Sequence, residues 1–143
     1  MLKGINSLLG PELLKVLRAM GHGDEIAIVD GNYPADADAK RLVRMDGHSA
    51  TDILDAVLSV MPLDDMVPDC AFRPAAMNDA ARMEPVFIDF ERIVKHYEPK
   101  AHISILVGAE FYNRVKACYA IVASSEARLY GNIVLKKGVI HPK

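Results

Sequence analysis

Apolar residues in this 143-residue chain recur with two different spacings, which alternate along the sequence. A helical spacing predicts helices over residues 11–20, 49–61, 84–97 and 110–116. Short apolar runs predict strands over residues 25–29, 103–107, 119–123 and 133–135. Residues 68–77 could hold a further strand, although a proline within it weakens that prediction. The polar stretch 35–44 predicts a loop that could contain a short helix or strand.

Local signals support the ends of two of these helices. Pro11 suits the first turn of a helix, and Gly21 suits the residue just beyond its end. Ser49 and Asp52 have the spacing of a capping box, with Asp in place of the usual Glu. Repeated alternation of helices and strands predicts an α/β fold with a central sheet covered by helices. We expect residues 1–143 to form a single domain of this kind.

Composition narrows the classes of function. Hydrophobic residues make up 51% and charged residues 25% of the chain, as in ordinary globular proteins. A net charge of −2 argues against a nucleic-acid partner. No apolar run approaches the roughly 20 residues that span a bilayer, and the N-terminus has no secretory pattern, so we expect no membrane partner. Cys70 and Cys118 lie far apart in sequence, and we expect both to be reduced core residues of a cytoplasmic protein.

The run Gly21-His22-Gly23-Asp24 joins the first helix to the first strand, which ends at Asp30. Histidine is the side chain whose ordinary pKa lies near neutrality, and glycine lets a ligand approach the backbone. The run therefore fits a proton-transfer site at the edge of a sheet. It equally fits a glycine helix stop with an incidental histidine.

Familiar catalytic and cofactor motifs are absent from the chain. It has no dinucleotide-binding or phosphate-binding glycine motif, no serine-hydrolase elbow and no zinc-protease motif. The five histidines have no metal-ligand spacing, so we expect no metal. Polar groups at predicted strand and helix ends remain as candidates: His22, Asp30, Asp64, Tyr112, Tyr130 and Asn132. Each could instead be structural, as a turn cap, a solvated acid, a core aromatic or an edge residue.

Five segments in order resemble the L-fucose mutarotase and D-ribose pyranase family, and the resemblance is closer to the fucose branch. The segments are Pro11-Glu12-Leu13-Leu14, Met20-Gly21-His22-Gly23-Asp24-Glu25-Ile26, Asp30-Gly31-Asn32-Tyr33-Pro34, Glu110-Phe111-Tyr112-Asn113-Arg114 with the following Ala120-Ile121-Val122, and the stretch from Tyr130-Gly131-Asn132 to Val139. The resemblance is thinnest over residues 35–40 and 69–83.

The resemblance implies an α/β fold, a ring-shaped homo-oligomer, often a decamer, and interconversion of the cyclic forms of a free monosaccharide without a cofactor. By motif, His22 matches the proton donor and Asp30 a sugar-binding acid. Tyr130 and Asn132 match sugar-binding groups, and Tyr112 and Asp64 match positions with acid–base or binding roles. The chain departs from the family at Gly108, where an arginine is common.

Mutarotation opens a cyclic hemiacetal and closes it again on the other face. We expect His22 to exchange a proton with the ring oxygen, and Tyr112 or Asp64 to act at the anomeric hydroxyl. We expect Asp30, Tyr130 and Asn132 to bind the other hydroxyls. Three alternatives stay open: a sugar-binding protein of this fold without turnover, a structural ring, and an isomerase of another kind.

Overall fold

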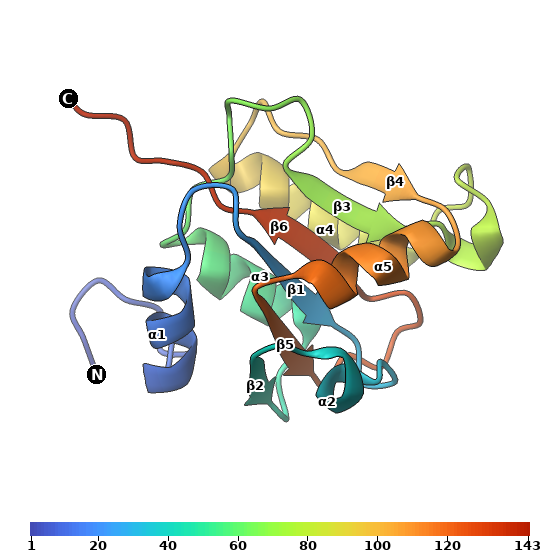
Figure 1. Cartoon of the computed structure of the whole chain (residues 1–143), viewed down its shortest axis with the longest axis horizontal. Helices are drawn as coiled ribbons and strands as arrows, with labels where there is room; N and C mark the ends of the chain where they lie inside the picture. The colour runs from blue at the N-terminus through green and yellow to red at the C-terminus, as the bar shows by residue number, and fades with distance from the viewer.

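The computed structural model describes residues 1–143 and contains six strands and five α-helices (Figure 1). The helices are α1 (Pro11–Ala19), α2 (Ala35–Asp38), α3 (Ala50–Leu58), α4 (Pro85–Tyr97) and α5 (Ala109–Ala117), and a 3-10 turn, η1, covers Ala76–Asn78. The strands are β1 (Glu25–Val29), β2 (Leu42–Met45), β3 (Ala71–Pro74), β4 (Ser104–Leu106), β5 (Ala120–Ser124) and β6 (Ile133–Lys136). None of the helices has the length and apolar character that crossing a bilayer requires.

The strands form one mixed sheet in the order β2-β5-β1-β6-β3-β4. Its β1–β5, β2–β5 and β3–β4 pairs are parallel, whereas β6 runs antiparallel to both of its neighbours, β1 and β3. Five strands therefore end at one edge of the sheet, which we call the carboxyl edge, and begin at the opposite amino edge. Strand β6 runs the other way, so it begins at the carboxyl edge.

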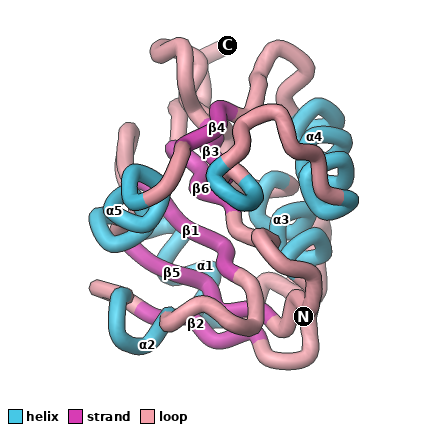
Figure 2. The backbone as a smooth tube through the Cα atoms, turned by 90° about the vertical axis from the view of Figure 1, so that its right-hand side faces the viewer, coloured by secondary structure: helices cyan, strands magenta, loops and turns pink.

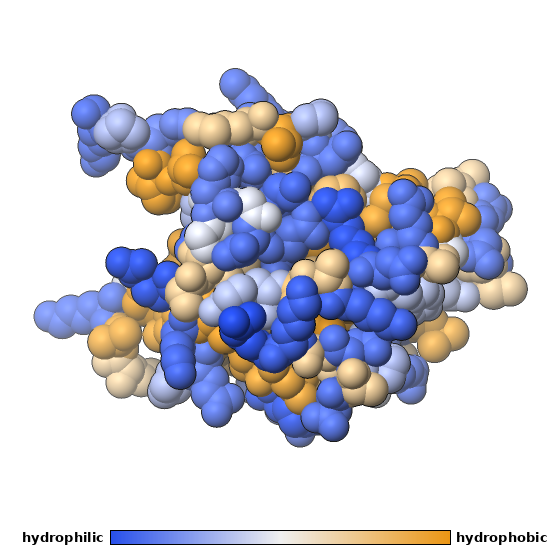
Figure 3. Space-filling view, in the orientation of Figure 1, coloured by the Kyte–Doolittle hydropathy of each residue, from blue (hydrophilic) through white to orange (hydrophobic).

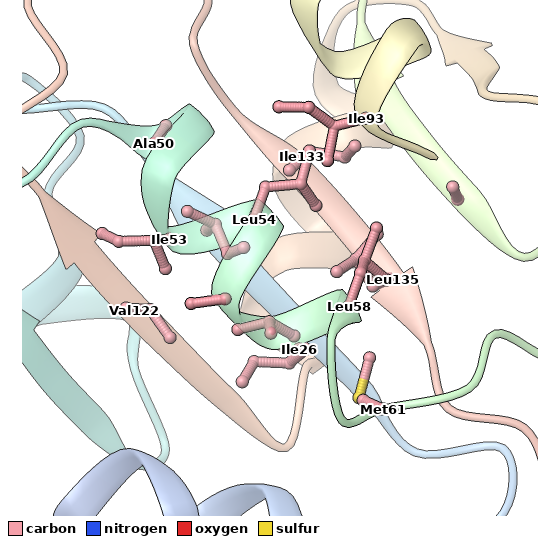
Figure 4. Close-up of a cluster of buried hydrophobic side chains, with 14 of the residues drawn as sticks. Ile26, Ala50, Ile53, Leu54, Leu58, Met61, Ile93, Val122, Ile133 and Leu135 are labelled. Carbon is pink, nitrogen blue, oxygen red and sulfur yellow. The ribbon is translucent and has the colours of Figure 1, made fainter. Parts of the chain in front are cut away.

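Helices cover both faces of this sheet (Figures 1 and 2). Helices α1, α3 and α4 pack on one face over a large apolar cluster, in which Ile53 and Leu54 of α3 meet Ile26, Ile133 and Leu135 of the sheet (Figure 4). Helix α5 packs on the other face over a smaller cluster that includes side chains from β1, β5 and β6. Burial on both faces explains why these strands read as continuous apolar runs.

The structure confirms the predicted α/β fold and all eight elements that were predicted from spacing. Ser49 caps α3 by accepting a hydrogen bond from the Asp52 N–H at 3.1 Å. Strand β3 forms within residues 68–77, and Pro74 is its last residue, where a missing N–H removes little pairing. Cys70 and Cys118 are buried and free, as predicted.

The polar stretch 35–44 contains more structure than its pattern indicates. Its first part forms the single turn α2, and its end forms the edge strand β2. Strand β2 buries only Val43, and it is held by its backbone pairing with β5. A strand with one buried side chain has no apolar alternation to detect.

Helix α4 offers a test of how firmly the larger cluster holds the fold. Phe90 is fully buried, and its truncation to alanine should lower the free energy of unfolding by about 3–5 kcal/mol. Ile88 on the same helix is 59% exposed, so Ile88→Ala should cost less than about 1 kcal/mol. Urea unfolding of both variants checks this. Equal losses in the two variants would contradict the assignment of the buried face.

Candidate active site

The first group of polar side chains lies at the carboxyl edge, around Asp30. The Asp30 N–H donates to Asn132 Oδ1 at 2.8 Å, and Asn132 Nδ2 donates to Asp30 Oδ2 at 3.2 Å. Asp30 Oδ1 accepts a third hydrogen bond, from the Asn32 N–H at 2.9 Å. Both side chains are buried, so the carboxylate is held in one orientation at the end of β1. The bonds from the Asp30 and Asn32 N–H groups also satisfy the backbone of this turn, so Asp30 and Asn132 have a structural role as well.

Tyr130 and Tyr112 lie at the same edge and line one cavity of about 540 Å³. Tyr130 directly precedes the Gly131-Asn132 approach to β6 and has a positive φ of 63°. Tyr112 projects from α5 with 44% of its surface exposed, so it is not a core aromatic. Its ring stacks on Tyr33 with 6.1 Å between the ring centroids. The cavity thus has two phenols on its walls. Tyr130 lies two residues before Asn132 in the chain, and Tyr112 stacks on Tyr33, in the turn that follows Asp30.

The sequence marks Tyr33 only as part of the motif that follows Asp30, and the structure shows its contribution. Its hydroxyl donates to Asp38 Oδ2 at 2.8 Å. Burial, followed by this hydrogen bond, raises the pKa of the Tyr33 phenol. Tyr33 therefore stays protonated at neutral pH, and its neutral ring stacks on the ring of Tyr112.

An ion-pair network fixes the loop that carries Tyr130. The Arg128 guanidinium donates two hydrogen bonds to Glu126, at 2.9 and 3.1 Å, and one to Asp89 of α4 at 2.7 Å. The hydrogen bond from Arg128 holds the pKa of the Glu126 carboxyl below its ordinary value, against the effect of burial. The backbone oxygen of Glu126 accepts from the Gly31 N–H at 2.9 Å. The network therefore ties the Tyr130 loop to the turn after Asp30.

Gly131 is required by the close packing of this loop. A Cβ at this position would stand 2.6 Å from Cγ of Glu126 and 3.1 Å from the backbone oxygen of Arg128. The Tyr-Gly-Asn sequence is thus a consequence of the approach of this loop to Glu126. The sequence showed residues 124–129 only as a polar connection, so it did not reveal Glu126 or Arg128.

The second group lies at the amino edge, around His22. His22 Nε2 is 3.1 Å from Asp64 Oδ1, and the His22 side chain is 43% exposed. The backbone positions both residues against the end of β6, because the Gly23 N–H donates to the Lys137 oxygen at 2.9 Å and the Asp64 N–H to the Lys136 oxygen at 3.0 Å. A carboxylate that contacts Nε2 fixes the ring and leaves Nδ1 to meet a ligand.

Asp64 is only 3% exposed, so it is not the solvated acid of the alternative interpretation. Burial by itself raises the pKa of this carboxyl. Hydrogen bonds from the Met66 N–H and from His22 outweigh burial and hold the pKa below its ordinary value. Asp64 is therefore ionised at neutral pH and also lines a cavity of about 420 Å³.

The structure divides the six predicted residues into these two groups. Because a strand rises about 3.3 Å per residue, the five residues of β1 separate the two groups by about 17 Å. Asp30, Tyr112, Tyr130 and Asn132 lie at one edge, and His22 and Asp64 lie at the other. One chain therefore does not bring the His22 imidazole to the tyrosines and the amide.

Neither edge resembles a metal or thiolate site. No group of three or more His, Cys, Asp or Glu side chains is arranged to hold a metal ion. Burial raises the pKa of the Cys118 thiol to about 12, which makes it a poor nucleophile at neutral pH. Hydroxyl, amide, carboxylate and imidazole groups are the chemistry that the two edges offer, and these groups bind hydroxyls and move protons.

Comparison with known proteins places this chain in a family. Residues 3–140 match the RbsD/FucU transport protein family. The chain belongs to this family. It is 39% identical to human fucose mutarotase over 145 residues, which cover 97% of this chain and 94% of the relative.

Two solved structures of the family show the same fold. Fucose mutarotase from Streptococcus pneumoniae, in complex with L-fucose, is 38% identical, with a TM-score of 0.88 over 98% of this chain and all of the other. RbsD from Bacillus subtilis, complexed with D-ribose, is 20% identical, with a TM-score of 0.75 over 99% of this chain and all of the other. The likeness to RbsD shows the shared fold. The two identities confirm that the chain is closer to the fucose branch.

The lowered pKa of Asp64 predicts a dependence of stability on pH. A carboxyl whose pKa is lower in the folded state stabilises the fold above its unfolded pKa, near 4, and this contribution disappears as the pH falls through the folded value. Asp64→Asn should therefore lose less free energy of unfolding than wild type between pH 7 and pH 3. Urea unfolding at both pH values measures this.

Asp36→Asn is the control for that measurement. Asp36 is exposed on α2, a helix that contains neither His22 nor Asp64. It should keep the wild-type difference between the two pH values. A full wild-type difference in Asp64→Asn would show that the contact with His22 does not stabilise the ionised carboxyl.

Proposed function

We propose that this chain is a monosaccharide mutarotase that interconverts the anomers of a free sugar, with L-fucose as the first substrate to test. The observation that carries the proposal is the pairing of His22 with the ionised Asp64, together with a second edge that offers tyrosine, amide and carboxylate groups. The names of the fucose mutarotases to which the chain is similar support the same reaction. The enzyme is an isomerase that needs proton transfer and no redox step.

Each group has one role in the proposed reaction. The anomeric hydroxyl gives its proton to the Tyr112 oxygen, and the exposed Tyr112 phenol passes its own proton to water, as the bond from the anomeric carbon to the ring oxygen breaks. The ring oxygen takes a proton from His22, whose ring Asp64 orients. The open aldehyde then rotates, and the same transfers in reverse close the ring on its other face. Positioned acid–base groups of this kind accelerate reactions by about 10²–10⁴-fold.

Asp30, Asn132 and Tyr130 bind the remaining hydroxyls in this proposal. Asp30 and Asn132 hold each other in place, so their free lone pairs are already oriented for a sugar hydroxyl. The Tyr130 phenol adds a group that can donate or accept. The carboxyl edge therefore recognises the sugar, while His22 at the amino edge exchanges a proton with the ring oxygen.

The proposed site is completed by two copies of the chain, because a single copy holds the two groups at opposite edges. Exposed apolar side chains accompany both groups. Met77 and Leu129 are 67% and 64% exposed near the carboxyl edge, and Met66 is 60% exposed beside Asp64. Figure 3 shows hydrophobic patches at the right-hand end, where η1 and the start of α5 lie, and others on the left and lower sides. Contact between copies would cover such surface. We propose a ring-shaped homo-oligomer, with a decamer as the expected size.

We further propose that the protein acts in the cytoplasm, which the two free, buried cysteines support. A sugar-binding protein without turnover is the second candidate. Gly108 favours it, because a glycine at this position of the cavity lining has no side chain to contact a sugar. Measured sugar binding without faster anomer exchange would decide for this candidate.

Replacement of His22 tests the mutarotase directly. Wild type should speed the exchange of L-fucose anomers well above the buffer rate, as measured by saturation-transfer NMR. His22→Ala should lose about 10²-fold or more of that acceleration, since the ring oxygen has no proton donor. His96→Ala, on the exposed surface of α4, should keep the wild-type rate. Exchange at the buffer rate in both wild type and His22→Ala would reject the proposal.

Mixing two inactive variants tests whether copies share the site. His22→Ala and Tyr112→Phe are each expected to be slow alone. Unfolded and refolded together in equal amounts, they should regain about a quarter of the wild-type rate, because about one site in four draws both intact groups from different chains. No recovery in a mixed assembly, verified by mass spectrometry, would place each site within one chain.

A further inference from the structure

The cavity at the carboxyl edge contains one polar side chain that the proposed reaction does not use. Its lining comes from the end of β3, from η1 and from the start of α5, and includes Asn78 and Gly108 beside Tyr112 and Tyr130. Asn78 is exposed, and its backbone N–H donates to the Ala75 oxygen at 3.2 Å, which leaves the side-chain amide available to a ligand. Asn78 thus offers two donors and an acceptor to whatever fills the cavity.

The backbone is arranged to present this amide. Met77 and Asn78 are consecutive non-glycine residues in the left-handed region, with φ of 53° and 56°. Such residues are uncommon, and the surrounding structure must offset the cost of holding two of them in succession. Asparagine tolerates this region better than most residues. The turn carries Asn78 toward Gly108, on the far wall.

Gly108 keeps the space in front of that amide open. Its φ of 60° and ψ of −135° suit glycine and exclude most side chains. A Cβ at this position would stand 3.7 Å from Asn78 Oδ1, and nothing else lies within 4 Å of it. The open space therefore lies between the Asn78 amide and the start of α5, on the same cavity as the two phenols.

We propose that Asn78 is a specificity-determining residue that hydrogen-bonds one hydroxyl of a neutral monosaccharide in this cavity. This inference rests on the proposed function. The amide carries no charge, and the lining of the cavity contains no cationic side chain, so a phosphorylated or acidic sugar finds no counter-charge there. Pro74, Ala75 and Ala109 supply apolar surface for the C–H face of a sugar ring.

The test compares wild type with Asn78→Gly, a variant that suits the left-handed backbone. L-Fucose and its monodeoxy analogues, each lacking one ring hydroxyl, are the probes. In wild type, removal of the hydroxyl that Asn78 binds should lower kcat/KM by about tenfold, and in Asn78→Gly the same removal should have no effect. With L-fucose itself, Asn78→Gly should raise KM by roughly 3- to 10-fold and leave kcat near wild type.

Asn113→Ala is the matched control, because Asn113 is exposed on α5 next to Tyr112 and does not line the cavity. It should behave as wild type with every sugar. Asn78→Asp, which also tolerates the left-handed region, serves if the glycine variant does not fold. It should weaken binding of the same hydroxyl by removing two donors.

The result that overturns the inference is an unchanged pattern of kcat/KM across all analogues in the folded Asn78 variants, while wild type remains an active mutarotase. Failure of the proposed function looks different, since wild type would then not speed anomer exchange at all. Calorimetric binding of the same analogues to wild type and Asn78→Gly tests Asn78 in that case, because it does not depend on turnover.

Discussion

The antiparallel pairing of β6 with β1 determines the position of the candidate site residues other than Tyr112, which lies on α5. In its register, Ile28 lies opposite Ile133 and Glu25 lies opposite Lys136. The start of β6 therefore brings Asn132 to Asp30, and its end brings Lys137 to the glycine-flanked His22. A slip of one residue would turn the buried side chains of β6 to the wrong faces and separate these partners. The apolar clusters on both faces prevent that slip.

The same pairing gives the two edges different electrostatic character. The amino edge holds an imidazole against a buried, ionised carboxylate, which suits the movement of a proton. The carboxyl edge holds the Asp30 carboxylate, whose hydrogen bonds are largely internal, among phenols and amides. Recognition of a neutral sugar through hydroxyl groups needs no strong field, and the net charge of −2 is consistent with a ligand that charge does not steer.

Much of the fold could be predicted because its elements bury apolar faces with clear spacing. The exceptions are informative: β2 buries only Val43, and α2 is a single turn, so neither leaves a pattern. The candidate residues could be named from motifs, but their grouping could not. Which of the two groups Asn132 and Asp64 join depends on the direction of β6, and its antiparallel direction has no signature in its sequence. The role of Glu126 likewise depends on a contact with Arg128 and on the close approach of Gly131.

The roles expected of the candidate residues come from the family resemblance, whereas their neighbours in space come from the structure. Asn78 shows the limit of both, since it lies in the segment where the resemblance is thinnest. Its importance comes from a left-handed backbone and from its position opposite Gly108, and neither is visible in the alanine-rich run 74–81.

The hydrogen bonds of Asp30 have a thermodynamic consequence. Its carboxylate is fixed by the Asn32 N–H and by the amide of Asn132, so folding has already removed the rotational freedom of this side chain. A mobile acid would lose about 0.5–1.5 kcal/mol of conformational entropy when a ligand immobilised it. Asp30 avoids most of that loss. Its contribution to affinity therefore depends on lone-pair directions set during folding, and a ligand whose hydroxyl does not match them cannot recruit the side chain by induced movement.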